Sequence, residues 1–570
     1  MKKKLISILT VALSCMLVLG GCGGKGKTTE KTPAEVKSGP VEGYAKATDS
    51  SKNVSLATDR KDTLVIGINA PEGIFNPLYS ESAYDIYIME SMFTGMIAPD
   101  EKGLPVEALA ESYKISEDGK TYSFKLRDGL KFDDGTPLTT EDVAFTFTAG
   151  CDKEYDGVVD FVNTTKIKGA KAYKEGTAST IEGIKVVDDK NIEFTLEEVN
   201  ADAIYDFTAQ ILSKAYYGKG YTQGHLNYIK DLHAKPLGCG AYKFVENKPG
   251  QEVDLVANEN YYLGKVKIPN LIYKVTSETT RIQMLQTGEI DMDMVTVNKD
   301  NVGKLQEAGF LDLHVFPTNG YGYIGFNMKD EKFTDVKVRQ ALTYGLNRKE
   351  IVEAVYAGGY ADVINVPQSK ESWAYSKPKN DYAFDKEKAG KLLDEAGWTI
   401  GSDGIREKDG KKLEIKFTAS TPNDVNDAII PVAQANYQEI GIKFEAEQMD
   451  FNAVREQVTS GKAQMFFMAW GLTPKIDNTG ILGTGGAQNK TGYSNPELDA
   501  LFLKGLQETD TEKRKAIYAD VYELINKELP YIFMYQRRDM WAVNSRVKGF
   551  ENQITPYKNF TYSLNKLTLE

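Results

Sequence analysis

Two stretches of the sequence repeat the order strand, helix, strand, and this order restricts the possible folds more than any other feature. In the first, a strand at 271–275 is followed by a helix that ends at Gly288, and 289–292 enters the next strand. In the second, strands at 413–417, 442–448 and 465–470 alternate with helices. Strands joined through a helix run parallel. We therefore predict an α/β protein with parallel sheet flanked by helices.

The starts of several helices are marked by side chains that cap the first turn. Such residues accept a hydrogen bond from a backbone N–H that has no partner within the helix. The predicted caps are Ser277, Asp335, Asn347 with Glu350, Asp385, and Thr509 with Glu512. The helices behind them carry one apolar face each and are predicted to be core scaffolding.

The stretch from Leu109 to Phe147 has a different pattern. Residues 122–126 alternate between apolar and polar, and two Asp-Gly pairs mark turns. Thr139, with Asp142 three residues later, predicts the start of a helix, and 186–196 predicts a second hairpin. We interpret this part, about 80–230, as a β-rich subdomain inserted into a first lobe.

Length and composition limit the class of protein. With 570 residues, the chain is long enough for three to five ordinary domains or two large lobes. Apolar residues at 41% and charged residues at 26% indicate a soluble globular protein. The net charge is −12 and no run of Lys and Arg exceeds three residues, which argues against nucleic-acid binding. The 32 tyrosines would suit a cleft that grips varied ligands, although most are expected in the core.

The N-terminus predicts export. Three lysines precede an apolar stretch, 5–19, that is too short to span roughly 30 Å of hydrocarbon. The sequence Leu19-Gly20-Gly21-Cys22 resembles the lipobox of bacterial lipoproteins, so 1–21 is predicted to be a signal peptide and Cys22 the lipidated residue. The alternative is ordinary secretion with cleavage nearby.

The segment that follows, 22–62, is polar and predicts a flexible tether with a reach of roughly 35 Å. We therefore expect an extracytoplasmic protein that is lipid-anchored to the membrane. The long tether favours the outer face of a Gram-positive membrane over a periplasm.

Few residues are available for covalent cross-links or metals. Once the signal peptide and Cys22 are set aside, Cys151 and Cys239 remain, and a disulfide between them is as reasonable as two buried thiols. His225, His233 and His314 have no metal-binding spacing, so we predict no metal site and no cofactor.

Several motifs resemble one known family. Ser116–Tyr122, Leu126–Gly129 and Phe132–Thr139 resemble the signature of solute-binding family 5, the extracytoplasmic oligopeptide-, dipeptide- and nickel-type binding proteins of ABC importers. Further stretches agree in order: Gly238–Phe244, Gly288–Asp291, Phe326–Asn327 with Asp335–Leu346, and Ala389–Trp398. The match runs from about Leu64 to Phe550, almost the whole exported chain.

The resemblance implies a fold and a set of partners. It implies a two-lobe clamp of the periplasmic-binding-protein type, in its large three-subdomain form, with the ligand buried between the lobes. We expect lobe I at 63–316, lobe II at 317–536 and a return to lobe I at 537–570. The clamp would close on its ligand and deliver it, as a monomer, to an ABC permease with cytoplasmic ATPases. No covalent chemistry is required.

The resemblance also implies site residues. In the family, a W-x-x-D arrangement places an aspartate against the ammonium of the peptide, but here Trp470-Gly471-Leu472 is followed by Thr473. A buried ammonium requires a negative partner. Either Asp477, the next carboxylate, takes that role through a longer loop, or the protein does not select a free N-terminus.

Other candidates come from two segments that the family places at the cleft. Phe75 and Asn76, with Tyr79 and Tyr84, match the first cleft loop. Tyr321, Tyr323 and Asn327 match a strand whose backbone lines the cleft, where an extended peptide could pair its main chain. The competing interpretation of each side chain is hydrophobic core or hinge packing.

Three functions remain to be compared. The first is the capture of an oligopeptide or dipeptide for an ABC importer. The second is the same clamp with a non-peptide cargo, an oligosaccharide or a metal chelate. The third is an exported hydrolase, which the sequence argues against because it contains no G-x-S-x-G, H-E-x-x-H or catalytic Cys/His signature. We therefore predict a binding protein and not an enzyme.

Overall fold

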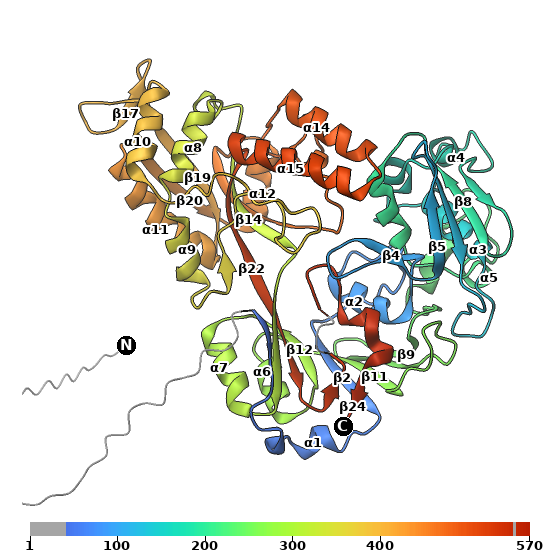
Figure 1. Cartoon of the computed structure of the whole chain (residues 1–570). Coiled ribbons are helices and arrows are strands. Elements are labelled where there is room, and N and C mark those ends of the chain that lie inside the picture. The colour runs from blue at the N-terminus through green and yellow to red at the C-terminus, as the bar shows by residue number, and fades with distance from the viewer. Residues whose placement is uncertain (1–41, 551–553) are drawn as a thin grey trace, which may run out of the picture. The chain divides into compact units, whose positions relative to one another are not determined.

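The computed structural model describes residues 42–550 and 554–570, which belong to one compact unit. The predicted signal peptide, Cys22 and the rest of 22–41 lie outside the described residues. The predicted flexible tether is wrong for 42–62, because this part folds onto lobe I: β1 (Gly43–Ala45) pairs with β13, and α1 follows at Ser55–Thr58. The described chain folds as a two-lobe α/β clamp with an inserted subdomain, as the sequence predicts (Figure 1). Lobe II has one hydrophobic core, and the faces of the lobe I sheet contribute to two others.

The sheet of lobe I is built around a buried central strand, β2 (Thr63–Ile68), which runs parallel to β11 and β12. Leu64, Ile66 and Ile68 pack into one core and Val65 into the other, as expected when alternate side chains point to opposite faces. The other elements of this lobe are β1 (Gly43–Ala45), α1 (Ser55–Thr58), α2 (Ala83–Met92), β9 (Tyr242–Lys248), β10 (Glu252–Ala257), β11 (Asn270–Val275), α6 (Arg281–Thr287), β12 (Met292–Val295), α7 (Lys299–Ala308) and β13 (Leu311–Pro317).

The sheet of lobe II contains the second set of parallel strands, in which β19 lies between β20 and β21 and runs parallel to both. Helices cover it. The elements are β14 (Gly320–Phe326), α8 (Val336–Tyr344), α9 (Arg348–Val355), β15 (Ala361–Asp362), α10 (Lys386–Glu395), β16 (Thr399–Ile400), β17 (Arg406–Lys408), β18 (Lys411–Lys412), β19 (Glu414–Ser420), α11 (Asp424–Glu439), β20 (Lys443–Met449), α12 (Phe451–Thr459), β21 (Met465–Gly471), α13 (Thr479–Leu482), α14 (Pro496–Gln507) and α15 (Thr511–Glu528).

The inserted subdomain is an antiparallel sheet of order β5-β6-β8-β7, packed on α3. Its core is aromatic: the ring centroids of Phe124 and Phe207 are 4.7 Å apart, and those of Phe147 and Phe194 are 4.8 Å apart. Its elements are β3 (Ile97–Pro99), β4 (Pro105–Glu107), β5 (Ala110–Ile115), β6 (Thr121–Leu126), α3 (Thr140–Gly150), α4 (Ala170–Lys174), β7 (Ile184–Val186), β8 (Asn191–Thr195), the 3-10 helix η3 (Ala201–Thr208) and α5 (Lys214–Tyr217).

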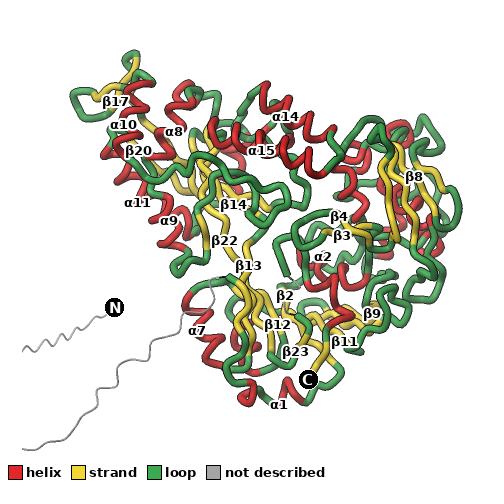
Figure 2. Tube along the Cα trace, viewed as in Figure 1, coloured by secondary structure: helices red, strands yellow, loops and turns green. Residues whose placement is uncertain are grey.

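One strand, β22 (Tyr531–Asn544), belongs to both sheets (Figure 2). Its first part, Tyr531–Tyr535, pairs with β14 of lobe II, and its second part, from Arg538, pairs with β13 of lobe I. The chain also passes from β13 to β14 through Thr318 and Asn319. These two crossings place the flexible joint of the clamp beside both sheets. The chain then ends on lobe I with β23 (Val547–Lys548), the 3-10 helix η6 (Phe560–Lys566) and β24 (Thr568–Leu569).

Some of the helix caps predicted from sequence are present in the structure and others are not. The capping box of Thr139 and Asp142 is present, and Asp335 and Asp385 cap their helices. Two predicted caps are wrong, because α6 begins after Thr280, not Ser277, and α15 is capped by Asp510, not Thr509.

The predicted box at Asn347 is half formed. The side chain of Asn347 accepts from the backbone of Glu350, but its own backbone N–H donates to Asn436. The two remaining cysteines, Cys151 and Cys239, are buried free thiols, so of the two alternatives the disulfide is the wrong one.

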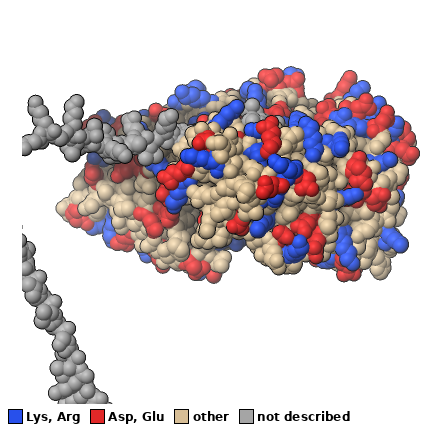
Figure 3. All heavy atoms as spheres, turned by 90° about the horizontal axis from the view of Figure 1, so that it is seen from below, with Lys and Arg blue, Asp and Glu red and all other residues tan. Residues whose placement is uncertain are grey.

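Charged side chains on the surface are mixed in sign. On the face shown in Figure 3, basic and acidic residues alternate, and neither gathers into a large patch.

Candidate ligand-binding site

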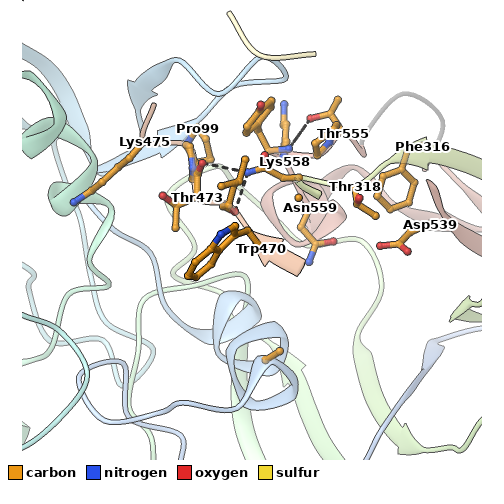
Figure 4. A pocket seen from close by; sticks show the side chains of 18 of the residues that line it. Pro99, Phe316, Thr318, Trp470, Thr473, Lys475, Asp539, Thr555, Lys558 and Asn559 are labelled. Atoms are coloured by element: carbon orange, nitrogen blue, oxygen red, sulfur yellow. Dashed lines mark hydrogen bonds between the residues drawn. The ribbon is translucent and has the colours of Figure 1, made fainter. Parts of the chain in front are cut away.

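A cavity of about 1290 Å³ lies between the lobes. Lobe I, lobe II, the inserted subdomain and the C-terminal segment all contribute to its walls. Figure 4 shows Trp470, Thr473 and Lys475 of lobe II together with Phe316 and Asp539 near the crossings. The cavity is larger than the roughly 300–1,000 Å³ typical of small-molecule pockets.

The lobe II wall is formed by the ends of β14 and β21. Gly320 and Gly471 pair across the two strands, and a Cβ on Gly320 would lie only 2.4 Å from the carbonyl oxygen of Trp470. The Trp470 ring is parallel to that of Tyr323, with centroids 6.1 Å apart, and Tyr323 stacks on Tyr531 at 4.1 Å. This stack fixes the orientation of the indole at the cavity surface.

The strand that offers a free backbone edge is β21. β14 is paired with β21 along its whole length and with β22 over 322–325. β21 pairs with β14 along its whole length but with β19 only at Met465 and Phe466. Among the described strands, none pairs with the other edge of 467–471. The sequence-based interpretation placed this edge on the strand of Tyr321, which is wrong because that strand is internal to the sheet.

The lobe I wall, by which we mean Tyr87, Glu90, Asp539, Trp541 and Tyr562, combines carboxylates with aromatic rings. Tyr87 and Glu90 come from α2, Asp539 and Trp541 from β22, and Tyr562 from the C-terminal segment. The Trp541 ring packs edge-on against Phe560 at 5.1 Å, so the C-terminal segment holds this wall in place from behind.

Most charged side chains of the cavity are paired within the protein. Lys475 of lobe II contacts Asp206 of the inserted subdomain at 2.5 Å, and Lys558 contacts Glu101 at 2.5 Å. Arg537 contacts Asp539 at 3.0 Å. Burial raises the pKa of Asp539, and the charge of Arg537 opposes that rise.

Glu90 has a different environment. Its Oε2 accepts hydrogen bonds from Thr561 at 2.7 Å and Asn559 at 3.2 Å, both neutral donors. Burial raises the pKa of Glu90 to about 7, and these two hydrogen bonds oppose the rise only in part.

Of the site residues predicted from sequence, three line the cavity: Trp470, Gly471 and Tyr321. Tyr323 lies behind Trp470 and is 2% exposed. Asn327 has a structural role, since its side-chain amide donates to the carbonyls of Gly461 and Ala463.

The first cleft loop does not reach the cavity. Phe75 is fully buried and packs on Phe244, and Asn76 accepts a hydrogen bond from the backbone of Leu78. Tyr79 packs edge-on against Tyr155, and Tyr84 accepts a hydrogen bond from Asn69. None of these four side chains is part of the cavity lining. The alternative interpretation, core packing, describes Phe75, Asn76 and Tyr79.

Asp477 also lies outside the lining. Its Oδ1 accepts from the Thr479 hydroxyl at 2.6 Å, and its backbone N–H donates to Asp202 at 3.1 Å. Asp202 in turn forms an ion pair with Arg514 at 2.5 Å, with each side chain 5% exposed. Burial, and then the charge of Asp202, raise the pKa of Asp477 to about 6. Asp477 therefore belongs to the interface between the inserted subdomain and lobe II.

Sequence reasoning missed the acidic side of the cavity. Glu90 lies within the apolar run Ile86–Met92 of α2, and a lone charge in such a run is the signal that could have identified it. Asp539 and Tyr562 carry no comparable local signal, because only the return of the chain to lobe I brings them to the cavity.

The described residues offer neither a ready metal-binding cluster nor a membrane-spanning helix. No group of three or more His, Cys, Asp and Glu side chains is placed to hold a metal ion. No helix within the described part of the chain has the length and apolarity to cross a membrane.

Comparison with known proteins gives a consistent result. Residues 105–492 match the model of "Bacterial extracellular solute-binding proteins, family 5 Middle". The oligopeptide-binding protein AppA of Bacillus subtilis is 29% identical over 573 residues, covering 96% of each chain. Its structure with a nonapeptide superposes with a TM-score of 0.66, covering 90% of this chain and 99% of that one.

Two further solved structures are similar. The substrate-binding protein CtaP of Listeria monocytogenes is 25% identical, with a TM-score of 0.77, covering 90% of this chain and 99% of that one. NikZ of Campylobacter jejuni, solved in complex with Ni(L-His), is 26% identical, with a TM-score of 0.69, covering 89% of this chain and 99% of that one.

Proposed function

Because this chain belongs to the bacterial extracellular solute-binding proteins of family 5, which are transport binding proteins and not enzymes, we propose that its cargo is an oligopeptide or dipeptide. The ligand would occupy the cavity between the lobes and then pass to the membrane subunits of an ABC importer. Of the residues predicted from sequence, Trp470, Tyr321 and Gly471 are proposed to contact it.

The free edge of β21 carries this proposal. An extended peptide can add itself as a strand to such an edge, which gives affinity through main-chain hydrogen bonds and little dependence on side chains. The edge, 467–471, includes Trp470, which lines the cavity, so peptide side chains would contact an aromatic surface. The similarity to AppA, solved with a nonapeptide, supports the same class of cargo.

Backbone-modified peptides test the strand-pairing mode. Two N-methylated isomers of one bound peptide would be compared. One isomer carries its methyl groups on the odd-numbered residues and the other on the even-numbered residues. The isomer that loses donors toward β21 should bind about ten-fold more weakly or worse by calorimetry, because each lost hydrogen bond leaves an unpaired polar group. Equal binding of both isomers and the unmodified peptide would reject pairing at β21.

We also propose that the protein is anchored to the membrane through lipid on Cys22. The motif before Cys22 supports this proposal, and two or more acyl chains are enough for stable membrane attachment. Cys22→Ala should move the protein from the membrane fraction to the soluble fraction or the medium, whereas Cys15→Ala, in the apolar stretch of the signal, should not. Retention of Cys22→Ala in the membrane would contradict lipid anchoring.

A chelated metal is the second candidate cargo, because the similar protein NikZ was solved with Ni(L-His). The described residues contain no cluster that could hold a bare ion, so the metal would have to arrive with its own ligands. Calorimetry with Ni(L-His) beside a peptide set separates the two cargoes: binding of the chelate alone would replace the peptide proposal.

A further inference from the structure

The cavity contains a carboxylate that the protein itself does not neutralise. The lining carries the acidic residues Glu90, Asp160, Asp206 and Asp539 and the basic residues Lys475, Arg537 and Lys558. All three basic residues are engaged in ion pairs with Asp206, Asp539 or Glu101. Among the described residues, no Lys, Arg or His lies within ion-pair distance of Glu90 or Asp160.

The two unpaired acids differ in what they already do. Asp160 caps a local turn: it accepts from the backbone N–H of Asn163 at 3.1 Å and from its side chain at 2.8 Å, so both carboxylate oxygens are occupied. Glu90 accepts its two hydrogen bonds through Oε2, while Oε1 accepts none from the described residues. One oxygen of Glu90 is therefore available to a ligand.

The surroundings of Glu90 suit an organic cation. Tyr87 and Tyr562 line the cavity with it: Tyr87 precedes Glu90 by three residues on α2, and Tyr562 directly follows Thr561, which donates to Glu90. Trp541 and Asp539 complete the lobe I wall. Aromatic faces attract an ammonium or guanidinium group, and the attraction increases when the group is desolvated.

We propose that Glu90 is the anionic centre of a subsite on the lobe I wall that takes an ammonium or guanidinium group of the ligand. Such a group could come from the N-terminus of a peptide or from a Lys or Arg side chain, since the chemistry at Oε1 is the same. The proposal rests on the proposed peptide-binding function and adds to it a preference for cationic peptides.

A purely structural role for Glu90 makes a different prediction. In that role, Glu90 would only hold Asn559 and Thr561 against α2, and a glutamine would keep an oxygen that accepts from both residues. Glu90→Gln would then leave ligand affinity unchanged. A role in cation binding instead requires the negative charge. The effect of Glu90→Gln on ligand affinity therefore distinguishes cation binding from a purely structural role.

Calorimetry with matched peptides provides the test. The probes are Ala-rich pentapeptides and nonapeptides in three forms: N-acetylated with one central Lys, N-acetylated with Gln in its place, and Gln-containing with a free N-terminus. Each is titrated into the wild-type protein, Glu90→Gln and Asp160→Asn. The last variant removes the same unit of charge from the same cavity.

We expect a cationic form to bind the wild-type protein at least about ten-fold more tightly than the neutral form, since a desolvated carboxylate gains a partner. Glu90→Gln should abolish that difference and Asp160→Asn should keep it. If the Lys peptide binds more tightly than the neutral peptide, the subsite takes the Lys side chain. If the peptide with a free N-terminus does so, the subsite takes the N-terminal ammonium.

The failures are distinguishable. If neutral and cationic peptides bind the wild-type protein equally, or if Glu90→Gln keeps the preference, the subsite is overturned while peptide binding stands. If no peptide of either length binds, the peptide cargo and the subsite that rests on it both fail.

Discussion

Asp202 and Glu90 are both acids removed from bulk water, but their surroundings differ. Asp202 contacts Arg514 at 2.5 Å, with both side chains 5% exposed, at the interface between the inserted subdomain and lobe II. Glu90 faces the cavity with only Thr561 and Asn559 as partners. The first acid has its counter-charge within the chain and stabilises the structure. The second has none, and its counter-charge is expected from the ligand.

The largest expected effect comes from removing the counter-charge of Asp202. Arg514→Met should lower the free energy of unfolding by about 3–5 kcal/mol, because it leaves Asp202 buried without a cation, next to Asp477. Denaturant unfolding at pH 7 measures it. The double variant Arg514→Met with Asp202→Asn should recover much of the loss. A single variant as stable as the wild type would mean that this pair is not the structural contact described here.

At Glu90, by contrast, removing the charge is expected to increase the free energy of unfolding. The pKa of Glu90 rises from 4.5 to about 7 on folding, so the folded state holds a proton that the unfolded chain releases. The resulting destabilisation is absent below pH 4.5, grows between 4.5 and 7, and is complete above 7. Glu90→Gln should therefore increase stability by about 1–3 kcal/mol at pH 8 and by little at pH 4.5. A variant less stable at pH 8 would show that the charge stabilises the fold.

The sequence predicted those features that depend on neighbouring residues. The capping box at Thr139 and Asp142 and the parallel strands of both lobes follow from local patterns, and the structure contains them. The position of Asp477 was not predictable in this way, because its environment is set by Asp202 and Arg514, which are distant in sequence.

The other wrong predictions at the cleft also concern features that depend on the assembled fold. Phe75 and Asn76 match a family segment, but a motif does not say whether a side chain points to the core or to the ligand. The free edge was assigned to the strand of Tyr321 because strand order is a property of the assembled sheet, in which β14 lies between β21 and β22. The hydrogen-bond partners of Glu90, Asn559 and Thr561, reach it only when the C-terminal segment folds back onto α2.

A smaller effect is expected on ligand affinity as the pH changes. Binding of a cation lowers the pKa of Glu90, so affinity should rise with pH and level off above about 7. For an N-acetylated Lys peptide we expect a fall of about ten-fold from pH 8 to pH 6.

Other titratable groups near Glu90 must be separated from it as the cause of the pH dependence of affinity. Tyr87, Tyr273 and Tyr562 have raised pKa values and stay neutral in this range, while Asp539 is the remaining acid of the wall. Calorimetric titrations of wild type and Glu90→Gln provide the comparison. A pH dependence that persists in Glu90→Gln would assign it to another group.

The smallest effect is expected at Asp477. Asp477→Asn keeps an acceptor for the Thr479 hydroxyl and removes a charge that lies outside the cavity. Affinity for free and N-acetylated peptides should each change by less than about two-fold, since no ligand group contacts this side chain. A selective loss for the peptide with a free N-terminus would restore Asp477 as the partner of the ammonium.

Affinity selection from a peptide mixture tests the central claim most directly. The wild-type protein, Glu90→Gln and Asp160→Asn would each be incubated with random-sequence peptides, and the retained peptides identified by mass spectrometry. We predict that the wild type and Asp160→Asn retain peptides enriched in those with a free amine or guanidinium, and that Glu90→Gln retains peptides without this enrichment. The same composition on all three proteins, or no peptide retained above background, would contradict the account.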